Sequence, residues 1–258
     1  AGQIFIDGKK VLKSGELHNI ESDIDYKSLH PQWVSRGALK ILKALNHFQI
    51  KPDGYICLDI GASTGGFSDV LLSKNVKKIF CVDVGTNQLH EKLVSNPKII
   101  NIQKTNAKLL NNEIITDKVD LIVCDVSFIS MKKVIKPSLN FLKNYGIIIG
   151  LIKPQFESSK KEIKKGGVIL DSEIHKRICD SFIEWFKIEC KMDVIGLIES
   201  PIKGPKGNTE FLICARKNYK YLKQWSANVV AIIASPTGTA LIPTQGSCLP
   251  LVEISFSL

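Results

Sequence analysis

The sequence predicts an α/β fold in which a mostly parallel, seven-stranded sheet carries helices on both faces. From residue 55 onwards, apolar runs of strand length alternate with amphipathic stretches, as in successive β-α units. Several of these runs end in a charged residue, and parallel sheets bind their ligands beyond the carboxyl ends of the strands. The 258 residues suffice for one substantial core. The predicted strands span residues 55–60, 78–83, 98–103, 119–124, 146–152, 193–199 and 209–216.

A turn of small residues after the first of these strands gives the strongest ligand-binding signal. A strand, a glycine-rich turn and a helix in this order bring backbone N–H groups close to a nucleotide-like ligand. The turn is not the dinucleotide fingerprint, because Ser63 stands where that pattern needs glycine. Asp59 disfavours a pyrophosphate and suits a ligand with a cationic amine and a sulfonium; an ordinary turn is the alternative. The candidate ligand-binding residues are Asp59, Gly61, Ser63, Gly65, Gly66 and Phe67.

Charged residues also end the neighbouring predicted strands. Asp83 closes one strand and is followed by Val84, Asp125 follows the strand at 119–124, and Lys153 follows a very apolar strand. Each charge alone could be a solvated strand end or a loop cap. Because the carboxyl ends of parallel strands meet at one edge of a sheet, their combination favours a common site.

The composition indicates a polyanionic partner and gives no sign of a metal site. The formal net charge is +10, which favours nucleic acid or an anionic membrane surface, although a generally basic protein is the alternative. The seven cysteines form no C-x-x-C pair, so we expect neither a disulfide framework nor zinc. No stretch has the length and apolarity of a membrane span, and no signal peptide is visible, so we expect a cytoplasmic protein without integral membrane association.

The ends of the chain differ from its centre. Residues 1–26 contain a short β segment with a hairpin turn at Asp7-Gly8, and residues 27–34 read as a linker. The main domain is expected at 35–218. The tail at 219–258 has no clear period, and we assign it no function.

Two helices are predicted with some detail. One covers about residues 35–45, with Ser35 as its N-cap and Lys40 off its apolar stripe, which favours a solvated lysine. The other spans 171–190 and is amphipathic. Its predicted core face comprises Ile174, Ile178, Phe182, Trp185 and Phe186.

The chain closely resembles the TlyA family, whose members are known as hemolysins or as ribosomal RNA 2′-O-methyltransferases and which is related to the FtsJ-like enzymes. The resemblance covers about residues 33–217 and is specific in the combination of its motifs. These are VSRGALK at 34–40, LDIGASTGGFSD at 58–69, VDVGTNQLH at 82–90, DLIVCDVSFIS at 120–130, LIKPQFE at 151–157, KKGGV at 164–168 and ESPIKGPKGNTEFL at 199–212.

The resemblance implies a Rossmann-like class I methyltransferase fold and S-adenosylmethionine as the cofactor. In that fold the acid at Asp83 holds the ribose hydroxyls of the cofactor, and Val84 and Asp125 also lie in its pocket. The Lys-Asp-Lys-Glu set of the family falls on Lys40, Asp125, Lys153 and Glu210 without substitution.

Lys153 is the expected centre of the chemistry, which is methyl transfer to a ribose 2′-hydroxyl. It acts either as the base that takes the hydroxyl proton or, if it stays charged, as a group that orients the hydroxyl and stabilises negative charge. Val126 and Ser127 follow Asp125 where methyltransferases of base nitrogens often have two prolines. This difference argues against methylation of an amino group.

Ribosomal RNA or a ribosomal subunit is the implied partner. A basic loop at 158–167 suits a phosphate backbone, although a solvated loop is the alternative. Residues 1–26 resemble the last part of an S-four-like RNA-binding domain. The candidate RNA contacts are Arg36, Lys160, Lys161, Lys164, Lys165, Lys203 and Lys206.

Three other functions remain open from the sequence. A cytolysin should offer amphipathic or apolar spanning segments, and none is visible before residue 219. A non-catalytic RNA-binding or ribosome-assembly protein would bind the cofactor without methylating RNA. A small-molecule O-methyltransferase would have no need of the basic loop.

Overall fold

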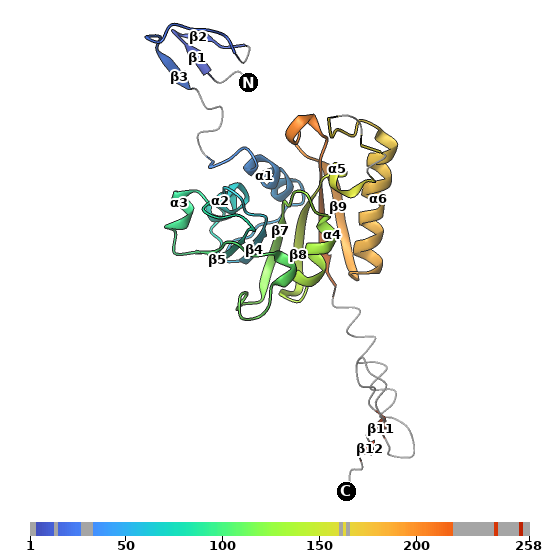
Figure 1. Cartoon of the computed structure of the whole chain (residues 1–258). Helices are drawn as coiled ribbons and strands as arrows, with labels where there is room; N and C mark the ends of the chain where they lie inside the picture. Colours follow the sequence, from blue (N-terminus) through green and yellow to red (C-terminus); the bar gives the residue numbers. More distant parts are fainter. Residues whose placement is uncertain are drawn as a thin grey trace.

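A seven-stranded sheet forms the centre of the molecule (Figure 1). The computed structural model describes residues 4–12, 15–26, 33–159, 162–163, 166–218, 240–241 and 253–254. The strands run in the order β6-β5-β4-β7-β8-β10-β9. All neighbours are parallel except β10, which is antiparallel to both β8 and β9. Their bounds are β4 (Ile56–Ile60), β5 (Lys78–Val82), β6 (Ile99–Ile102), β7 (Val119–Cys124), β8 (Leu142–Ile152), β9 (Met192–Glu199) and β10 (Phe211–Lys217), so all seven predicted strands are confirmed.

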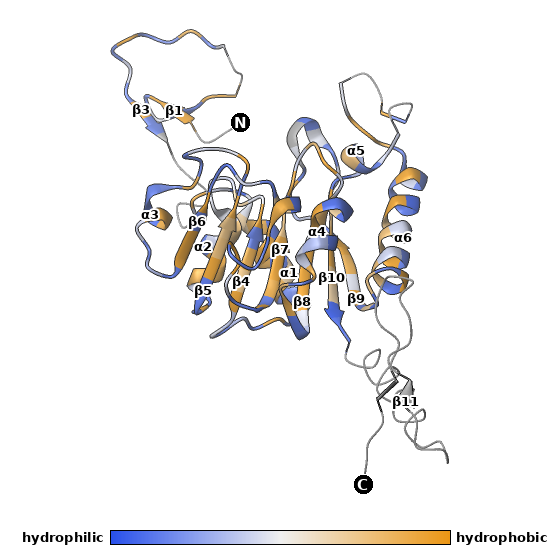
Figure 2. Ribbon diagram, turned by 60° about the horizontal axis from the view of Figure 1, so that its bottom comes forward, coloured by the Kyte–Doolittle hydropathy of each residue, from blue (hydrophilic) through white to orange (hydrophobic). Residues whose placement is uncertain are grey.

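Helices cover both faces of the sheet, as predicted. Successive residues of β7 point to opposite faces: Ile122 packs with α4 and α6, whereas Leu121 packs with α1 and α2. Figure 2 shows the apolar strands enclosed between helices whose outer surfaces are hydrophilic. The helical segments are α1 (Ala38–His47), α2 (Gly66–Ser73), α3 (Glu91–Val94), α4 (Met131–Ser138), α5 (Pro154–Glu157) and α6 (Ser172–Ile188), with short 3-10 turns η1 (Ala107–Leu109) and η2 (Pro205–Gly207).

The start of α1 differs from the prediction. Ser35 is not the N-cap; the cap position is Gly37, and no side chain caps the helix. A tight turn precedes the helix, in which the N–H of Ala38 donates to the carbonyl of Ser35 (3.2 Å). Lys40 was expected on the solvated face, but it is buried on the same side as Ile41. An apolar stripe alone could not reveal this, because the two acids that pair with Lys40, Asp125 and Glu210, come from other segments of the chain.

The predicted core face of α6 is confirmed. Ile178, Phe182, Trp185 and Phe186 are buried, and Ile174 packs half-buried against them. The side chain of Asp171 caps the helix by accepting from the N–H of Glu173 (2.8 Å). This helix therefore closes one face of the sheet beside α4.

Small β segments lie outside the main sheet (Figure 1). The predicted hairpin is confirmed, with β1 (Ile4–Ile6) paired to β2 (Lys9–Lys10) across Asp7 and Gly8, both at positive φ. A third short strand, β3 (Ile24–Tyr26), pairs antiparallel with β1. Two further strands, β11 (Ala240–Leu241) and β12 (Glu253–Ile254), pair antiparallel. Residues 27–32 of the predicted linker and the rest of the tail lie outside the described residues.

The strand order creates a topological switch point between β4 and β7. From β4 the chain moves outward to β5 and β6, and then returns to place β7 on the other side of β4. The loops that follow β4 and β7 therefore diverge from adjacent strand ends, which is where open α/β sheets bind ligands. They approach closely: a Cβ at Gly61 would lie 2.7 Å from the carbonyl oxygen of Asp125.

A carboxyl group is buried directly below this switch point. Asp59 is 1% exposed; its Oδ2 accepts from the hydroxyl of Ser68 (2.6 Å), whose oxygen also lies 3.1 Å from the sulfur of Cys81. Its Oδ1 has no hydrogen-bond partner among the described residues. Burial raises the pKa of Asp59 to about 7; the Ser68 bond opposes this rise, and the charges of Asp125 and Asp83 add to it.

The raised pKa predicts how stability depends on pH. In the unfolded chain Asp59 loses its proton near pH 4, whereas the folded protein retains it until about pH 7, so this group lowers stability progressively across that window. An Asp59→Asn variant has no such proton. We therefore expect its free energy of unfolding, relative to the parent, to rise between pH 4 and pH 7 and to level off above. Urea titrations at several pH values measure this difference, and a difference that does not depend on pH would contradict the burial argument.

Candidate active site

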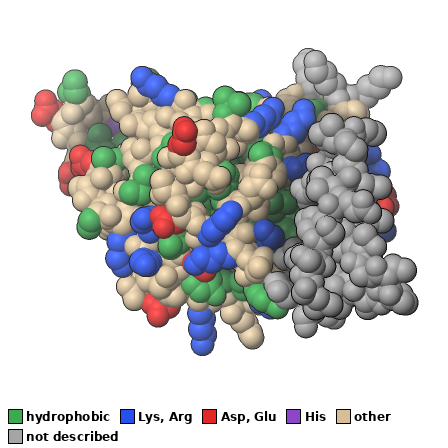
Figure 3. Space-filling view, turned by 90° about the horizontal axis from the view of Figure 1, so that it is seen from below, with side chains coloured by type: hydrophobic (Ala, Val, Ile, Leu, Met, Phe, Trp, Pro, Cys, Tyr) green, Lys and Arg blue, Asp and Glu red, His purple; other side chains and the backbone are tan. Residues whose placement is uncertain are grey.

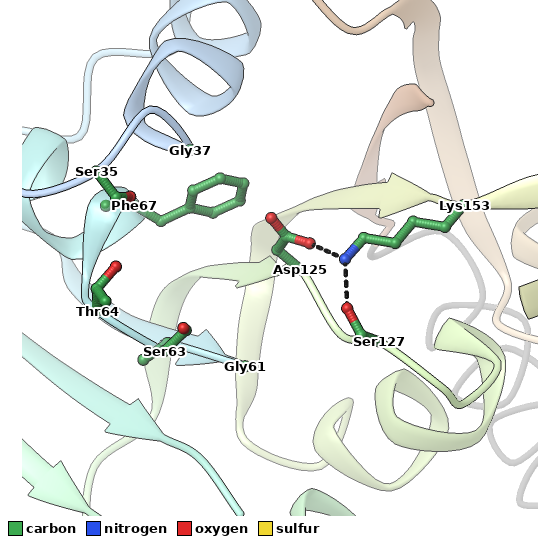
Figure 4. A pocket seen from close by; sticks show the side chains of 11 residues that line it. Ser35, Gly37, Gly61, Ser63, Thr64, Phe67, Asp125, Ser127 and Lys153 are labelled. Carbon is green, nitrogen blue, oxygen red and sulfur yellow. Dashed lines mark hydrogen bonds and ion pairs between the residues drawn. The ribbon is translucent and has the colours of Figure 1, made fainter. Parts of the chain in front are cut away.

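A cavity of about 180 Å³ opens at the switch point between β4 and β7 (Figure 4). Three segments form its walls: the turn before α1, the loop from β4 into α2, and the ends of β7 and β8. The ring of Phe67 points across the cavity toward Asp125. The lining residues are Ser35, Gly37, Gly61, Ala62, Ser63, Thr64, Gly66, Phe67, Asp125, Ser127 and Lys153.

A chain of charged groups runs from the interior to this cavity. Lys40 on α1 lies between two acids, with its Nζ 2.8 Å from Oε2 of Glu210 and 3.3 Å from Oδ2 of Asp125. The other oxygen of Asp125 lies 2.5 Å from Nζ of Lys153 at the end of β8. The Nζ of Lys153 donates to the hydroxyl of Ser127 (2.8 Å). The structure thus brings together all four members of the predicted Lys-Asp-Lys-Glu set.

The burial of these groups explains their pairing. Lys40 and Lys153 are each 7% exposed and Glu210 is fully buried, so any one of them without its partner would leave an uncompensated charge, which costs about 3–5 kcal/mol. Two cations and two anions alternate along the chain, so their charges cancel. Only Asp125, Lys153 and Ser127 line the cavity; Lys40 and Glu210 lie behind them.

Gly204 lies against Glu210, which is the innermost of these charged groups. A Cβ on Gly204 would lie 2.2 Å from Oε1 of Glu210, so a larger residue there would displace the carboxylate from its present position. The backbone oxygen of Glu210 accepts from the N–H of Ser200 (2.8 Å), which closes the loop between β9 and β10. The loop at 200–210 is therefore packed directly onto the acid that pairs with Lys40.

A second cavity of about 540 Å³ lies beside the first and shares Gly61, Ser63, Asp125 and Ser127 with it. Both oxygens of Asp83 accept backbone bonds at its edge, from the N–H of Ser63 (2.8 Å) and of Gly85 (2.8 Å). The other lining residues are mostly apolar, with a few polar side chains among them. They are Ile60, Val82, Val84, Gln88, Thr105, Asn106, Ala107, Val126, Phe128, Ile129 and Val134.

The loop between β4 and α2 keeps its shape through contacts within the protein. Gly65 has φ +94, and a Cβ there would meet Leu93, while a Cβ on Gly66 would meet the hydroxyl of Ser35. Ser63 adopts φ +48 without being glycine. Of the predicted cofactor residues, Asp59 and Gly65 line neither cavity, whereas Gly61, Ser63, Gly66, Phe67, Asp83, Val84 and Asp125 line at least one.

Three predicted RNA contacts are exposed in the described part of the chain. Arg36 lies between Ser35 and Gly37 of the cavity wall, and Lys203 and Lys206 lie in the loop that leads to Glu210. Basic residues also occur far from the site: Figure 3 shows Lys and Arg side chains, with Asp and Glu among them, on the face seen from below. Charge alone therefore does not mark the site. Lys160, Lys161, Lys164 and Lys165 lie outside the described residues.

Sequence reasoning missed several residues that border the site. Ser35, Gly37 and Thr64 line the smaller cavity, and no feature of the sequence distinguished them as ligand contacts. Phe128, which lines the larger cavity, is 90% exposed, and its ring lies 5.0 Å from that of Phe156. Ser127 carried a signal, namely that it replaces a proline of a known methyltransferase pattern, but its contact with Lys153 became visible only in the structure.

The chain is similar to two curated proteins with different names. It is 40% identical over 214 residues to Hemolysin A of Brachyspira hyodysenteriae, covering 82% of this chain and 88% of that protein. It is 36% identical over 217 residues to the 16S/23S rRNA (cytidine-2′-O)-methyltransferase TlyA of Mycobacterium tuberculosis, covering 84% of this chain and 81% of that protein. These relatives agree with the resemblance noted in the sequence.

A solved structure and a family model lead to the same assignment. A protein of Streptococcus thermophilus that was provisionally named a hemolysin matches with a TM-score of 0.74 and 31% identity, over 88% of both chains. The model of the FtsJ-like methyltransferases matches residues 33–217, which include the whole seven-stranded sheet and every member of the charged chain. This protein belongs to the FtsJ-like methyltransferase family.

Proposed function

We propose that the protein transfers a methyl group from S-adenosylmethionine to a ribose 2′-hydroxyl of ribosomal RNA. The observation that carries this proposal is the buried chain of alternating charges, which ends in a lysine at the wall of a cavity at the switch point. The name of the Mycobacterium tuberculosis relative supports ribosomal RNA as the substrate. We place the reaction in the cytoplasm, where ribosomal RNA is found.

The two connected cavities suit the parts of this cofactor. The larger one has apolar walls and a few polar groups, as nucleoside sites do, and each oxygen of Asp83 retains a lone pair for a ribose hydroxyl. Two carboxyl groups, those of Asp83 and Asp125, lie in the walls, which suits a cationic ligand. When bound, S-adenosylmethionine supplies a methyl group made electrophilic by its sulfonium. We assign Asp59 an indirect role, because it lies below the loop and lines neither cavity.

The residues around the smaller cavity can assist a weak nucleophile. Methyl transfer would join the hydroxyl oxygen to the methyl carbon and leave the cofactor as a neutral thioether, so the residues of this chain would have to hold the hydroxyl and take up or stabilise the loss of its proton. If Lys153 is neutral, its Nζ accepts that proton; if it is charged, it holds the hydroxyl and stabilises the negative charge that develops on oxygen. Asp125 fixes the position of Lys153, and Lys40 and Glu210 fix Asp125.

The name Hemolysin A of a relative favours a second candidate, which is lysis of membranes. Over the described part of the chain, we find no helix with the length and apolarity needed to cross a bilayer. Release of a dye from phosphatidylcholine vesicles by the purified protein tests this candidate. Equal release by the parent and by a Lys153→Ala variant would show a lytic activity that is separate from methyl transfer.

Replacing Asp83 tests the cofactor site. Asp83→Ala removes the acceptor for two hydroxyls, and hydrogen bonds to a charged group contribute about 1.5–3 kcal/mol each. We expect affinity for S-adenosylmethionine to fall at least about tenfold in calorimetric titrations. Because Asp83 also accepts from Ser63 and Gly85, a thermal melt of the cofactor-free variant serves as the folding control. Unchanged affinity in a folded variant would exclude Asp83 from the site.

Replacing Lys153 tests the chemistry. Lys153→Ala should lower methyl transfer to ribosomal RNA by about a hundredfold or more, while affinities for cofactor and RNA stay within a few-fold. Lys153→Arg separates the two roles, since arginine stays protonated and cannot act as a base. Substantial activity in the Arg variant would argue against proton abstraction. Methylation by Lys153→Ala at the parent rate would show that the assignment of this lysine is wrong.

A matched pair of triple variants tests the RNA surface. Replacing Arg36, Lys203 and Lys206 by Ala removes three exposed positive charges, one between Ser35 and Gly37 of the cavity wall and two in the loop that leads to Glu210. The control replaces three exposed lysines near the amino ends of β4 and β5, namely Lys51, Lys74 and Lys77. In the first variant only, we expect the slope of log affinity against log salt concentration to become less negative by about two to three units. Cofactor affinity should be unchanged in both variants. Equal slopes in the two variants would show that these three residues have no special role.

A further inference from the structure

We propose that Ser127 is a positioning residue for Lys153, whose hydroxyl oxygen aims the Nζ of the lysine at the group to be methylated. This inference rests on the proposed function and adds a fifth member to the charged chain. Within the described residues, Lys153 donates one hydrogen bond to a residue of the cavity wall that does not belong to the Lys-Asp-Lys-Glu set. That residue is Ser127.

The two contacts of Lys153 differ in kind. The Nζ lies 2.5 Å from Oδ1 of Asp125, and this contact is an ion pair between opposite charges. The contact with Oγ of Ser127, at 2.8 Å, has hydrogen-bond geometry. An ion pair depends mainly on distance, whereas a hydrogen bond also depends on direction. Asp125 therefore determines where the nitrogen lies, and Ser127 determines how it is rotated.

The rotation of the terminal amino group of Lys153 matters because its nitrogen has a fixed number of bonding directions. Besides Cε, a lysine nitrogen has three tetrahedral positions, and all are N–H groups when it is charged. The dashed lines of Figure 4 mark the contacts of this nitrogen with Ser127 and with Asp125, and each contact takes one of the three positions. The third position is available to a group in the cavity that all three residues line. It presents an N–H if the lysine is charged and a lone pair if it is neutral, so the hydroxyl of Ser127 serves either role of Lys153.

A single ion pair could not fix this arrangement. The lysine side chain has four rotatable bonds, and Asp125 divides its carboxylate between Lys153 and Lys40. Ser127 follows Asp125 by two residues in the same loop, so both partners of Lys153 are carried by one short piece of backbone. The following residue, Phe128, has φ +64, which makes this loop conformation specific.

The sequence supports the same role. In methyltransferases of base nitrogens the position of Ser127 is often proline, which has no side-chain group that could accept a bond from lysine. Serine at this position supplies the acceptor. Serine in place of proline thus gives Lys153 a hydrogen-bond acceptor at a site that methylates oxygen.

The test combines Ser127→Ala and Ser127→Thr with the Lys153→Ala variant. The substrates are ribosomal subunits and transcribed ribosomal RNA that lack 2′-O-methyl groups. With saturating RNA and S-adenosylmethionine, we expect Ser127→Ala to lower the single-turnover rate about tenfold or more, the scale of a hydrogen bond to a charged group. The KM for RNA and the Kd for cofactor should change less than about threefold. Ser127→Thr, which keeps the hydroxyl, should restore most of the rate.

The double variant shows whether Ser127 acts through Lys153. If it does, Ser127→Ala has no further effect in a Lys153→Ala background, because the group that it orients is gone. Independent, multiplicative losses would overturn the inference, as would a Ser127→Thr variant as slow as Ser127→Ala. A Ser127→Ala variant at the parent rate, with Lys153→Ala inactive, would overturn the inference and leave the proposed function standing. A folded parent that methylates none of these substrates would overturn both.

Discussion

The carboxylate of Asp125 is the group on which the site depends, because two buried lysines share it. Its oxygens lie 2.5 Å from Lys153 and 3.3 Å from Lys40. Without it, two cations from different elements would face each other in surroundings that are poor in water, which is costly. Lys40 in turn neutralises Glu210, which is fully buried. The charges of the site therefore support one another, and none of them is stable in its present place alone.

The same residue connects this chain of charges to the neighbouring cavity. The N–H of Asp125 donates to the carbonyl of Ile60 (3.0 Å), and the carbonyl of Asp125 lies against Gly61. One contact between two loops thus sets the distance between the larger cavity and Lys153. Reactions between two bound groups gain much of their rate from such fixed positions. In the proposed reaction, the backbone at the switch point aligns the methyl donor with the acceptor.

The sequence predicted those parts of the structure that depend on local pattern. All seven strands follow from apolar runs such as 119–124 and 146–152, and the hairpin follows from Asp7-Gly8. The resemblance supplied Lys40 and Glu210, since nothing in their local sequence marks them as neighbours. The periodicity of α1 misplaced Lys40, because a lysine on a buried face is recognisable only when its acids, Asp125 after β7 and Glu210 before β10, are known. Ser127 and Ser35 were missed for the same reason: their partners, Lys153 and Gly66, come from distant parts of the chain.

The antiparallel strand β10 has a consequence for how the protein is completed during synthesis. Because it runs against its neighbours, its first residues lie at the sheet edge where β7 and β8 end, and this brings Glu210 to Lys40. The strand must also enter between β8 and β9, both of which leave the ribosome earlier. When synthesis has reached only the end of β9, the strand that joins β8 to β9 is still missing. Glu210, which pairs with Lys40, is missing as well. Insertion of β10 thus both joins β9 to the sheet and supplies Glu210, so a partly made chain holds Lys40 and Lys153 without the acid that pairs with Lys40.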